Sequence, residues 1–246
     1  PVANVMIRNW GVSAAFQIIA VCFAVVLLLA SAFVEQGPEE AGQMLPGGGR
    51  DMSWREMLCQ KKFYGMCAML LCGGLSGMMV ISSASDMAQV EAGFSPAAAA
   101  LMVSVLSLFN AGGRASAGIL SDKLGRIGTL SLVFPISVAA LCALFFFGQD
   151  SMAVFAVSIA LVGACFGALM GIFPGFTADE FGQRNNTVNY GILFFGFALS
   201  GMLGPQVASW VMSGTGSYRS AFLIAAVVAL AGFAFTFLHR RLAARS

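Results

Sequence analysis

Arg114 is the residue of this chain with the clearest chemical potential, because it stands inside a long apolar stretch eight residues before Asp122. Asn110 and Ser107 precede it by four and seven residues, so a helix would place all three on one face. A guanidinium carries five N–H donors in a fixed plane and can bind a carboxylate through two parallel hydrogen bonds. The three residues are therefore candidate ligands for a small organic anion, whereas Asn110 and Ser107 could equally be hydrogen-bonding contacts between membrane helices.

The depth of Arg114 follows from the rise of a helix. Eight residues correspond to about 12 Å, which predicts a position near the middle of a hydrocarbon core of about 30 Å. A charge there costs at least about 2.5 to 3.5 kcal/mol on insertion scales and normally faces a functional cavity. The alternative is a structural arginine that reaches the membrane surface or pairs with a helix C-terminus.

The composition indicates that these residues lie in a membrane. Of the 246 residues, 59% are hydrophobic and 10% are charged, against about 25% charged residues in an ordinary soluble domain. Seven apolar stretches are long enough to cross the hydrocarbon core as helices. They cover approximately residues 13–34, 63–85, 96–120, 129–147, 152–177, 188–212 and 220–238. Since backbone amides in lipid must be satisfied within the segment, we expect an all-α membrane protein.

The distribution of lysine and arginine predicts the orientation. If segments 35–62, 121–128 and 178–187 share one side with the C-terminus, that side carries ten basic residues. They are Arg50, Arg55, Lys61, Lys62, Lys123, Arg126, Arg184, Arg240, Arg241 and Arg245. The other side carries only Arg8 and Arg219. We therefore expect a multi-pass protein of the plasma membrane with its C-terminus in the cytoplasm.

A pattern at the start of the chain recurs near its end. Residues 1–18, PVANVMIRNWGVSAAFQI, resemble residues 204–224, GPQVASWVMSGTGSYRSAFLI, as expected of a duplicated half. We expect residues 1–34 to hold the end of the fifth helix and the whole sixth helix of a twelve-helix protein, whose missing N-terminal half would precede this chain. Residues 63–238 would then form the C-terminal six-helix half. Residues 35–62 would be a cytoplasmic linker in which only MSWREML could form a short helix, and residues 239–246 a basic cytoplasmic tail.

No motif for a cofactor, a metal ion or enzymatic chemistry accompanies these helices. The cysteines form no C-x-x-C pair, and the single histidine, His239, lies in the basic tail with no expected partner. Asp86 and Glu91 are expected to be solvated acids at the outer end of the second span, with a role in a gate or in proton transfer as the alternative. There is no H-E-x-x-H, no nucleophile elbow and no acid pair within a span. We therefore expect no enzyme, no cofactor and no nucleic-acid partner.

The segment that follows Arg114 has the specific pattern G-x-x-S-D-K-x-G-R, formed around Gly118, Asp122, Lys123, Gly125 and Arg126. It resembles the signature loop of the major facilitator superfamily, here at the junction of the second and third helices of the C-terminal half. Glycine permits a tight turn, and Asp122 can meet a basic partner or the positive end of a helix. In that superfamily the loop acts as a latch that stabilises either the inward-facing or the outward-facing state. The resemblance therefore implies a conformational role for these five residues.

Four segments are similar to the oxalate/formate antiporter family of the superfamily, which is close to the monocarboxylate transporters. They are GLSGMMVISSASDMAQ, NAGGRASAGILSDKLGR, FGALMGIFPGFTADEFG and NNTVNYGILFFGFALSG. The resemblance implies the major facilitator fold, alternating access between two halves, and carboxylate binding by Arg114. It also places Phe166 and Met170 at the positions of a substrate cage, and Phe197 at the position of a second basic residue found in dicarboxylate exchangers.

Phe197 carries no charge, which leaves one cation in an apolar cage. A dicarboxylate would bring a second charge without a visible partner, at a desolvation cost of several kcal/mol. We therefore expect a small monocarboxylate such as pyruvate, lactate or formate, with a proton or a counter-anion as the coupled species, unless the preceding half supplies a second cation. The alternatives left open are dicarboxylate exchange of the oxalate/formate type, drug or cation export, and solute sensing on the same fold.

Overall fold

The computed structural model describes residues 2–32 and 51–243, and these residues form helices joined by short turns, without a strand. They fall into two units, one containing α1 (Val2–Ser31) and the other containing the remaining helices. Within the described residues, seven helical segments are long and apolar enough to cross a membrane. The all-helical membrane fold class and the seven spans predicted from the sequence are confirmed.

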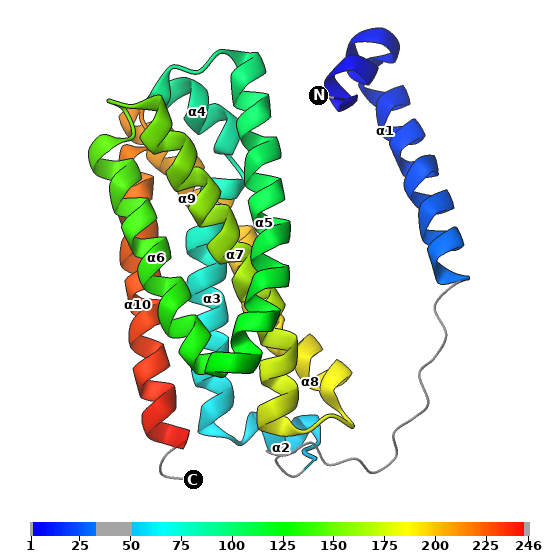
Figure 1. Ribbon diagram of the computed structural model, residues 1–246, viewed down its shortest axis with the longest axis vertical. Helices are drawn as coiled ribbons and strands as arrows, with labels where there is room; N and C mark the ends of the chain where they lie inside the picture. The colour runs from blue at the N-terminus through cyan, green and yellow to red at the C-terminus, as the bar shows by residue number, and fades with distance from the viewer. Residues whose placement is uncertain (1, 33–50, 244–246) are drawn as a thin grey trace. The chain divides into compact units, whose positions relative to one another are not determined.

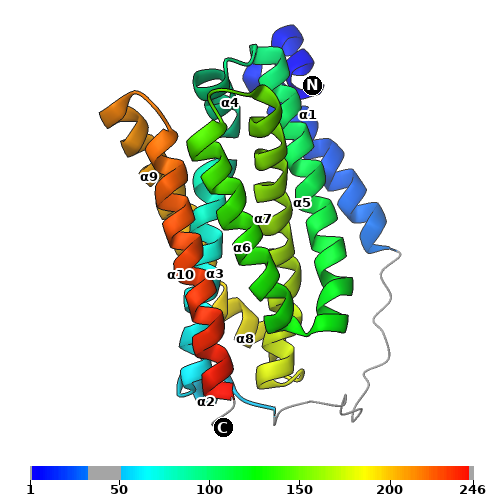
Figure 2. The ribbon, with the colours of Figure 1, turned by 60° about the vertical axis from the view of Figure 1, so that its left-hand side comes forward.

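The second unit is a bundle of long helices that lie roughly side by side (Figure 1). The long helices are α3 (Lys61–Ile81), α5 (Pro96–Leu124), α6 (Arg126–Phe147), α7 (Met152–Phe181), α9 (Phe195–Thr215) and α10 (Arg219–Ala243). Three short helices, α2 (Trp54–Leu58), α4 (Ala84–Ala92) and α8 (Asn186–Leu193), complete it. Both ribbon views place α4 at one end of this unit and α2 and α8 toward the other (Figure 2). We call the end with α2 and the C-terminal end of α10 the basic end.

The predicted loop at residues 121–128 is wrong. Helix α5 continues to Leu124 and α6 begins at Arg126, so Asp122 and Lys123 are helical residues. The whole connection is Gly125, whose φ of 76° is a conformation that residues with a Cβ rarely adopt. Only this glycine of the pattern makes the expected tight turn, because Gly118 lies inside α5.

Two predicted spans are interrupted. The second ends as α3 at Ile81, and α4 resumes the helix at Ala84. The sixth consists of α8 and α9, which meet at Phe194. Hydropathy averages over such breaks, because the residues on both sides of each break are apolar or small.

The repeat noted between the ends of the chain has a counterpart in the backbone. Gly11 interrupts α1 with a φ of 79°, and Gly216 ends α9 with a φ of 70°. The two glycines are 205 positions apart, the same separation as the two sequence copies. A glycine with positive φ therefore lies at the turn of both copies, although ψ is 168° at Gly11 and 11° at Gly216.

Helices α5 and α7 pack backbone against backbone through the glycines that repeat every four residues in α7. A Cβ built on Gly163, Gly167 or Gly171 would collide with the carbonyl of Leu106, Asn110 or Arg114, respectively. The two helices therefore run in the same direction with a constant offset of 57 residues. This confirms that the glycine spacing is a packing signal of the kind that lets membrane helices approach closely.

Candidate substrate-binding site

Helix α5 carries Ser107, Asn110 and Arg114, as predicted. The Ser107 hydroxyl is exposed and donates to the carbonyl of Val103 in its own helix, at 2.8 Å. Asn110 is half-buried, and its backbone lies against Gly167 of α7. The substrate-binding roles of all three stay predictions.

The Arg114 side chain is exposed on the bundle. Among the residues that the structure describes, it makes no ion pair and no hydrogen bond. Arg114 lies ten residues before the end of α5, or about 15 Å along the helix, so it is well inside the span rather than at its end. An exposed cation at this depth is available to an anionic ligand.

The charge of Arg114 on α5 acts electrostatically on Tyr190 of α8. Tyr190 belongs to the segment NNTVNYGILFFGFALSG, but the sequence predicted no role for it. No spacing rule could have paired the two residues, because they are 76 positions apart on helices that both contact α7.

Aromatic rings connect Tyr190 to the predicted cage. The ring centroids of Tyr190 and Phe194 are 5.4 Å apart, and those of Phe194 and Phe197 are 4.7 Å apart. The centroids of Phe197 and Phe166 are 5.9 Å apart. We call these four rings the aromatic ladder. Tyr190 lies in α8, Phe194 at the α8–α9 junction, Phe197 in α9 and Phe166 in α7. The ladder therefore continues from α8 to α9 across the break at Phe194.

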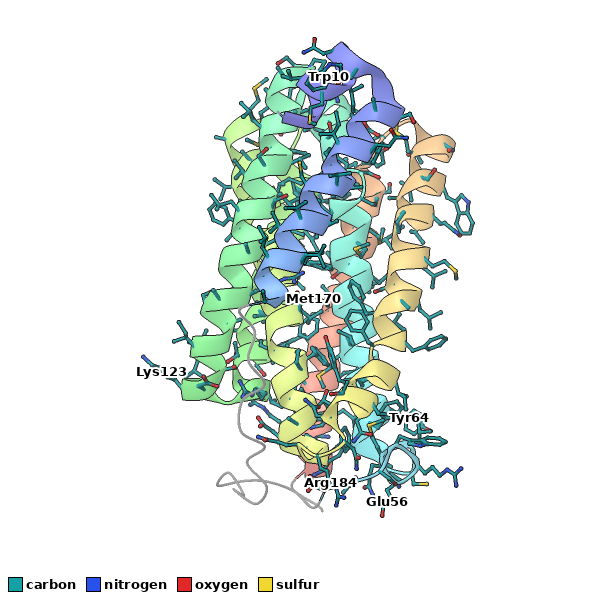
Figure 3. The ribbon with its side chains drawn as sticks, turned by 90° about the vertical axis from the view of Figure 1, so that its right-hand side faces the viewer. Trp10, Glu56, Tyr64, Lys123, Met170 and Arg184 are labelled. Carbon is teal, nitrogen blue, oxygen red and sulfur yellow. The ribbon has the colours of Figure 1, made fainter. Side chains whose placement is uncertain are left out.

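The predicted cage residues are packed to different degrees. Phe166 and Met170 of α7 are 7% and 9% exposed, whereas Phe197 is half-buried. Met170 lies one helical turn after Phe166, about midway along the bundle (Figure 3). The absence of a Cβ at Gly77 makes room for the Phe166 ring, and Gly74 does the same beside Phe197. The structure therefore brings Phe166 and Phe197 together, with Met170 on the same face of α7 as Phe166.

At the basic end, Arg126 connects the α5–α6 turn to α7. Its Nε donates to Asp179 at 2.8 Å, and its Nη1 donates to Asp122 at 2.9 Å and to the Ser121 hydroxyl. A Cβ on Gly175 would crowd the guanidinium, at 3.0 Å from Nη2. Asp179 was not singled out from the sequence, because only the folded chain brings the end of α7 to this turn.

The other latch residues are less constrained. Lys123 projects from the bundle at the level of the α5–α6 turn (Figure 3), and in the described part of the chain it has no ion-pair partner. Gly118 could carry a side chain without a clash, since no atom lies within 4 Å of the place of a Cβ. The latch role of the five predicted residues stays a prediction, and Arg126 has the contacts best suited to it.

Residues 1–205 of the chain match the Major Facilitator Superfamily. The chain belongs to this superfamily. The MFS-type transporter YhjX of Escherichia coli (strain K12) is 29% identical over 79% of this chain and 48% of its own. The oxalate:formate antiporter of Oxalobacter formigenes is 25% identical over 95% of this chain and 56% of its own. Monocarboxylate transporter 12 of Rattus norvegicus is 27% identical over 60% of this chain and 30% of its own.

The solved structures agree with this assignment. The superfamily transporter FucP in the outward conformation has a TM-score of 0.68 at 16% identity, over 93% of this chain and 55% of FucP. The chain spans about half the length of the two bacterial relatives it matches. It is a multi-pass membrane protein, and the resemblance to the superfamily and its oxalate/formate branch is confirmed.

His239 has a partner, contrary to the expectation of a tail residue without one. It lies in α10, is 1% exposed, and its Nε2 is 3.4 Å from Glu180 at the end of α7. Lys62 contacts the same carboxylate at 3.3 Å, and the ring of Phe176 meets the imidazole edge-on at 5.2 Å. This superfamily member therefore joins α3, α7 and α10 at the basic end through one partly buried cluster.

Glu91 is not a solvated loop acid either. It is 6% exposed and accepts hydrogen bonds from Gln149 at 2.6 Å, from the Ser217 hydroxyl at 2.9 Å and from the backbone N–H of Tyr218. A carboxylate at the start of α10 is favoured by the positive end of the helix dipole. Burial raises the pKa of the nearby Tyr218 hydroxyl, which therefore stays neutral at pH 7. Glu91 is a structural acid that joins three chain segments at the end opposite to the basic end.

We expect the contact between Arg126 and Asp179 to show a measurable coupling. Arg126→Gln and Asp179→Asn should each destabilise the full-length protein, and the double variant should lose about 0.5 to 1 kcal/mol less than the sum, as partly exposed pairs do. Thermal unfolding of the purified protein in detergent measures this, with Lys123→Gln as a neutral control. Strictly additive effects would contradict the assignment of this pair as a link between the turn and α7.

Proposed function

We propose that the protein transports a small monocarboxylate by alternating access, with Arg114 as the counter-ion of the substrate carboxylate. The observation that carries this proposal is an arginine deep in a span that no described carboxylate neutralises. Such a charge is costly in a membrane, so a structural arginine would be expected to be paired. The names of two relatives, an oxalate:formate antiporter and a monocarboxylate transporter, support a carboxylate as cargo.

The chain supplies one side of the transport site in this proposal. Its helices are the sixth to the twelfth of a twelve-helix transporter, and the preceding half completes the cavity over the exposed face of α5. Superfamily folds of this type bind substrate at the interface of two halves that rock against each other. The excess of basic residues at one end of the bundle supports a cytoplasmic location for that end and for the C-terminus, in the plasma membrane.

The aromatic ladder supports a monoanion over a dianion. Phe197 stands where a second cation would bind a second carboxylate, and its neighbours in the ladder are also aromatic. A second charge buried against these rings would lack a partner, at a desolvation cost of several kcal/mol. The ladder therefore suits a substrate in which the part beyond the carboxylate is uncharged and compact.

The test is uptake of labelled lactate, pyruvate, formate and oxalate by vesicles that contain the full-length protein. Wild-type protein should take up monocarboxylates in preference to oxalate. Phe197→Lys should raise oxalate uptake relative to lactate by about tenfold or more, because the new ammonium pairs with the second carboxylate.

Phe195→Lys is the matched control for that variant. Phe195 is 66% exposed, two positions from Phe197, and lies outside the aromatic ladder. It should leave the ratio of oxalate to lactate unchanged. Preferred oxalate uptake by the wild type, or equal effects of the two lysines, would reject the monoanion assignment.

A further inference from the structure

Helix α2 is anchored to the basic end of the bundle, although the sequence placed it in a linker. Met57 of α2 is 0% exposed, and the backbone N–H of Met52 donates to the carbonyl of Phe181 at the end of α7, at 2.9 Å. The side-chain amides of Asn185 and Asn189 donate in turn to the carbonyl of Met52, at 3.2 and 3.1 Å. These contacts fix the orientation of α2, so the direction of its outward side chains is defined as well.

The outward side of α2 and of the start of α3 combines two aromatic rings with two cations. Trp54 is 42% exposed and Tyr64 is 60% exposed, and Arg55 and Lys61 are exposed as well. The Arg55 guanidinium lies over the Trp54 ring, 5.0 Å from its centroid. Lys61 precedes Tyr64 by three residues on the first turn of α3, which places both on one side of that helix. We call these four residues the interfacial corner.

The two cations of the interfacial corner lack carboxylate partners. Within the described part of the chain neither Arg55 nor Lys61 makes an ion pair, whereas the neighbouring Lys62 contacts Glu180. The carboxylate of Glu56 is engaged in the capping box of α2. It accepts hydrogen bonds from the backbone N–H and the hydroxyl of the N-cap serine, each at 2.8 Å. The corner therefore offers two cations to an anionic partner from outside the described residues.

The interfacial corner lies where the α3 span meets the surface of the membrane. Lys61 and Tyr64 belong to the first turn of this span, and Figure 3 shows Tyr64 and Glu56 at the basic end of the bundle. Tryptophan and tyrosine are enriched at this level of a membrane, because their rings are apolar and carry one polar group. Lysine and arginine at the same level attract anionic lipid headgroups. The corner therefore matches the surface of an anionic bilayer in both polarity and charge.

We propose that the interfacial corner binds the headgroup of an anionic phospholipid in the leaflet at the basic end. Arg55 and Lys61 bind the phosphate through charge-assisted hydrogen bonds, while the rings of Trp54 and Tyr64 lie against the glycerol and the first carbons of the acyl chains. A bound lipid holds α2 at the membrane surface. Through the hydrogen bonds of Met52 it also stabilises the first turn of α8 and the end of α7.

The experiment measures the thermal midpoint of the purified full-length protein in detergent as phosphatidylglycerol or the neutral lipid phosphatidylcholine is added. We expect phosphatidylglycerol to raise the midpoint of the wild type more than phosphatidylcholine does. Arg55→Gln and Lys61→Gln should each increase the phosphatidylglycerol concentration at half of the maximal shift by about fivefold, because each removes one charge contact. Trp54→Ala should act in the same direction, since it removes the ring beneath the Arg55 guanidinium.

Lys123→Gln is the matched control for the loss of one positive charge. Lys123 is also exposed and without an ion-pair partner among the described residues, but it projects from the side of the bundle away from Tyr64 (Figure 3). It should keep the wild-type response to phosphatidylglycerol.

Equal shifts with the two lipids, an unchanged response of the Arg55 and Lys61 variants, or an equal loss in Lys123→Gln overturns the inference. A shift of the same size with inorganic phosphate also overturns it, because the ligand is then a free anion and not a lipid. The measurement needs no transported substrate, so its outcome is independent of the proposed function.

Discussion

Replacing Arg114 by alanine should lower kcat/KM for lactate uptake by about a hundredfold or more, with normal insertion of the protein. Removing one partner of a desolvated, hydrogen-bonded charge pair costs about 2 to 5 kcal/mol, because the remaining carboxylate has no counter-ion. The cost falls on binding and not on folding, since Arg114 is exposed and makes no ion pair with the described residues. Uptake of labelled lactate by reconstituted vesicles measures it.

Arg114→Lys refines this expectation. Lysine keeps the charge but loses the planar, bidentate geometry, so we expect an intermediate loss of about tenfold. Arg184→Ala is the control for net charge, because Arg184 is an exposed arginine at the basic end (Figure 3). Full lactate uptake in Arg114→Ala would refute the counter-ion role.

Gly167→Ala should have the second largest effect, and we expect this effect on the stability of the protein. A Cβ at Gly167 would collide with the backbone carbonyl of Asn110, which cannot rotate away as a side chain can. Separating α5 from α7 by the width of a methyl group should cost about 1 to 3 kcal/mol and lower the thermal midpoint in detergent. It should also move Arg114 relative to the ladder, so the surviving protein should transport lactate more slowly.

Gly112→Ala is the matched control for that substitution. Gly112 also lies in the middle of a packed span, but no atom lies within 4 Å of the place of its Cβ. It should be neutral or stabilising, because alanine favours a helix over glycine by up to about 1 kcal/mol. Equal midpoints for the two variants would show that the α5–α7 contact does not depend on Gly167.

The spans could be predicted from the sequence because each depends on its own residues. A helix in lipid satisfies its backbone hydrogen bonds internally, so length and hydropathy identify it without knowledge of its neighbours. The packing role of Gly163, Gly167 and Gly171 was predictable for a related reason. Four-residue spacing of small residues marks one face of a helix as a contact surface, whatever the partner is.

Predictions about charged residues at the ends of spans were wrong more often than predictions about the spans themselves. His239 was expected to lack a partner and Glu91 to be solvated, but both are buried with partners more than 50 positions away. Hydropathy places such residues at an interface, and it contains no information on which chain end meets which. The loop at residues 121–128 failed for a similar reason, since charge indicated a loop where α5 simply continues.

The sequence by itself determined seven apolar helices, their charged ends, the glycine-lined contact face of α7 and the presence of one arginine deep in a span. Only the tertiary structure decided that α7 lies against α5 with a constant offset, that Asp179 meets Arg126, and that Tyr190 joins the rings of Phe194, Phe197 and Phe166. The physical reason is that the free-energy cost of placing a segment in lipid depends only on the residues of that segment. Which side chains share a site depends instead on how helices far apart in the chain pack together.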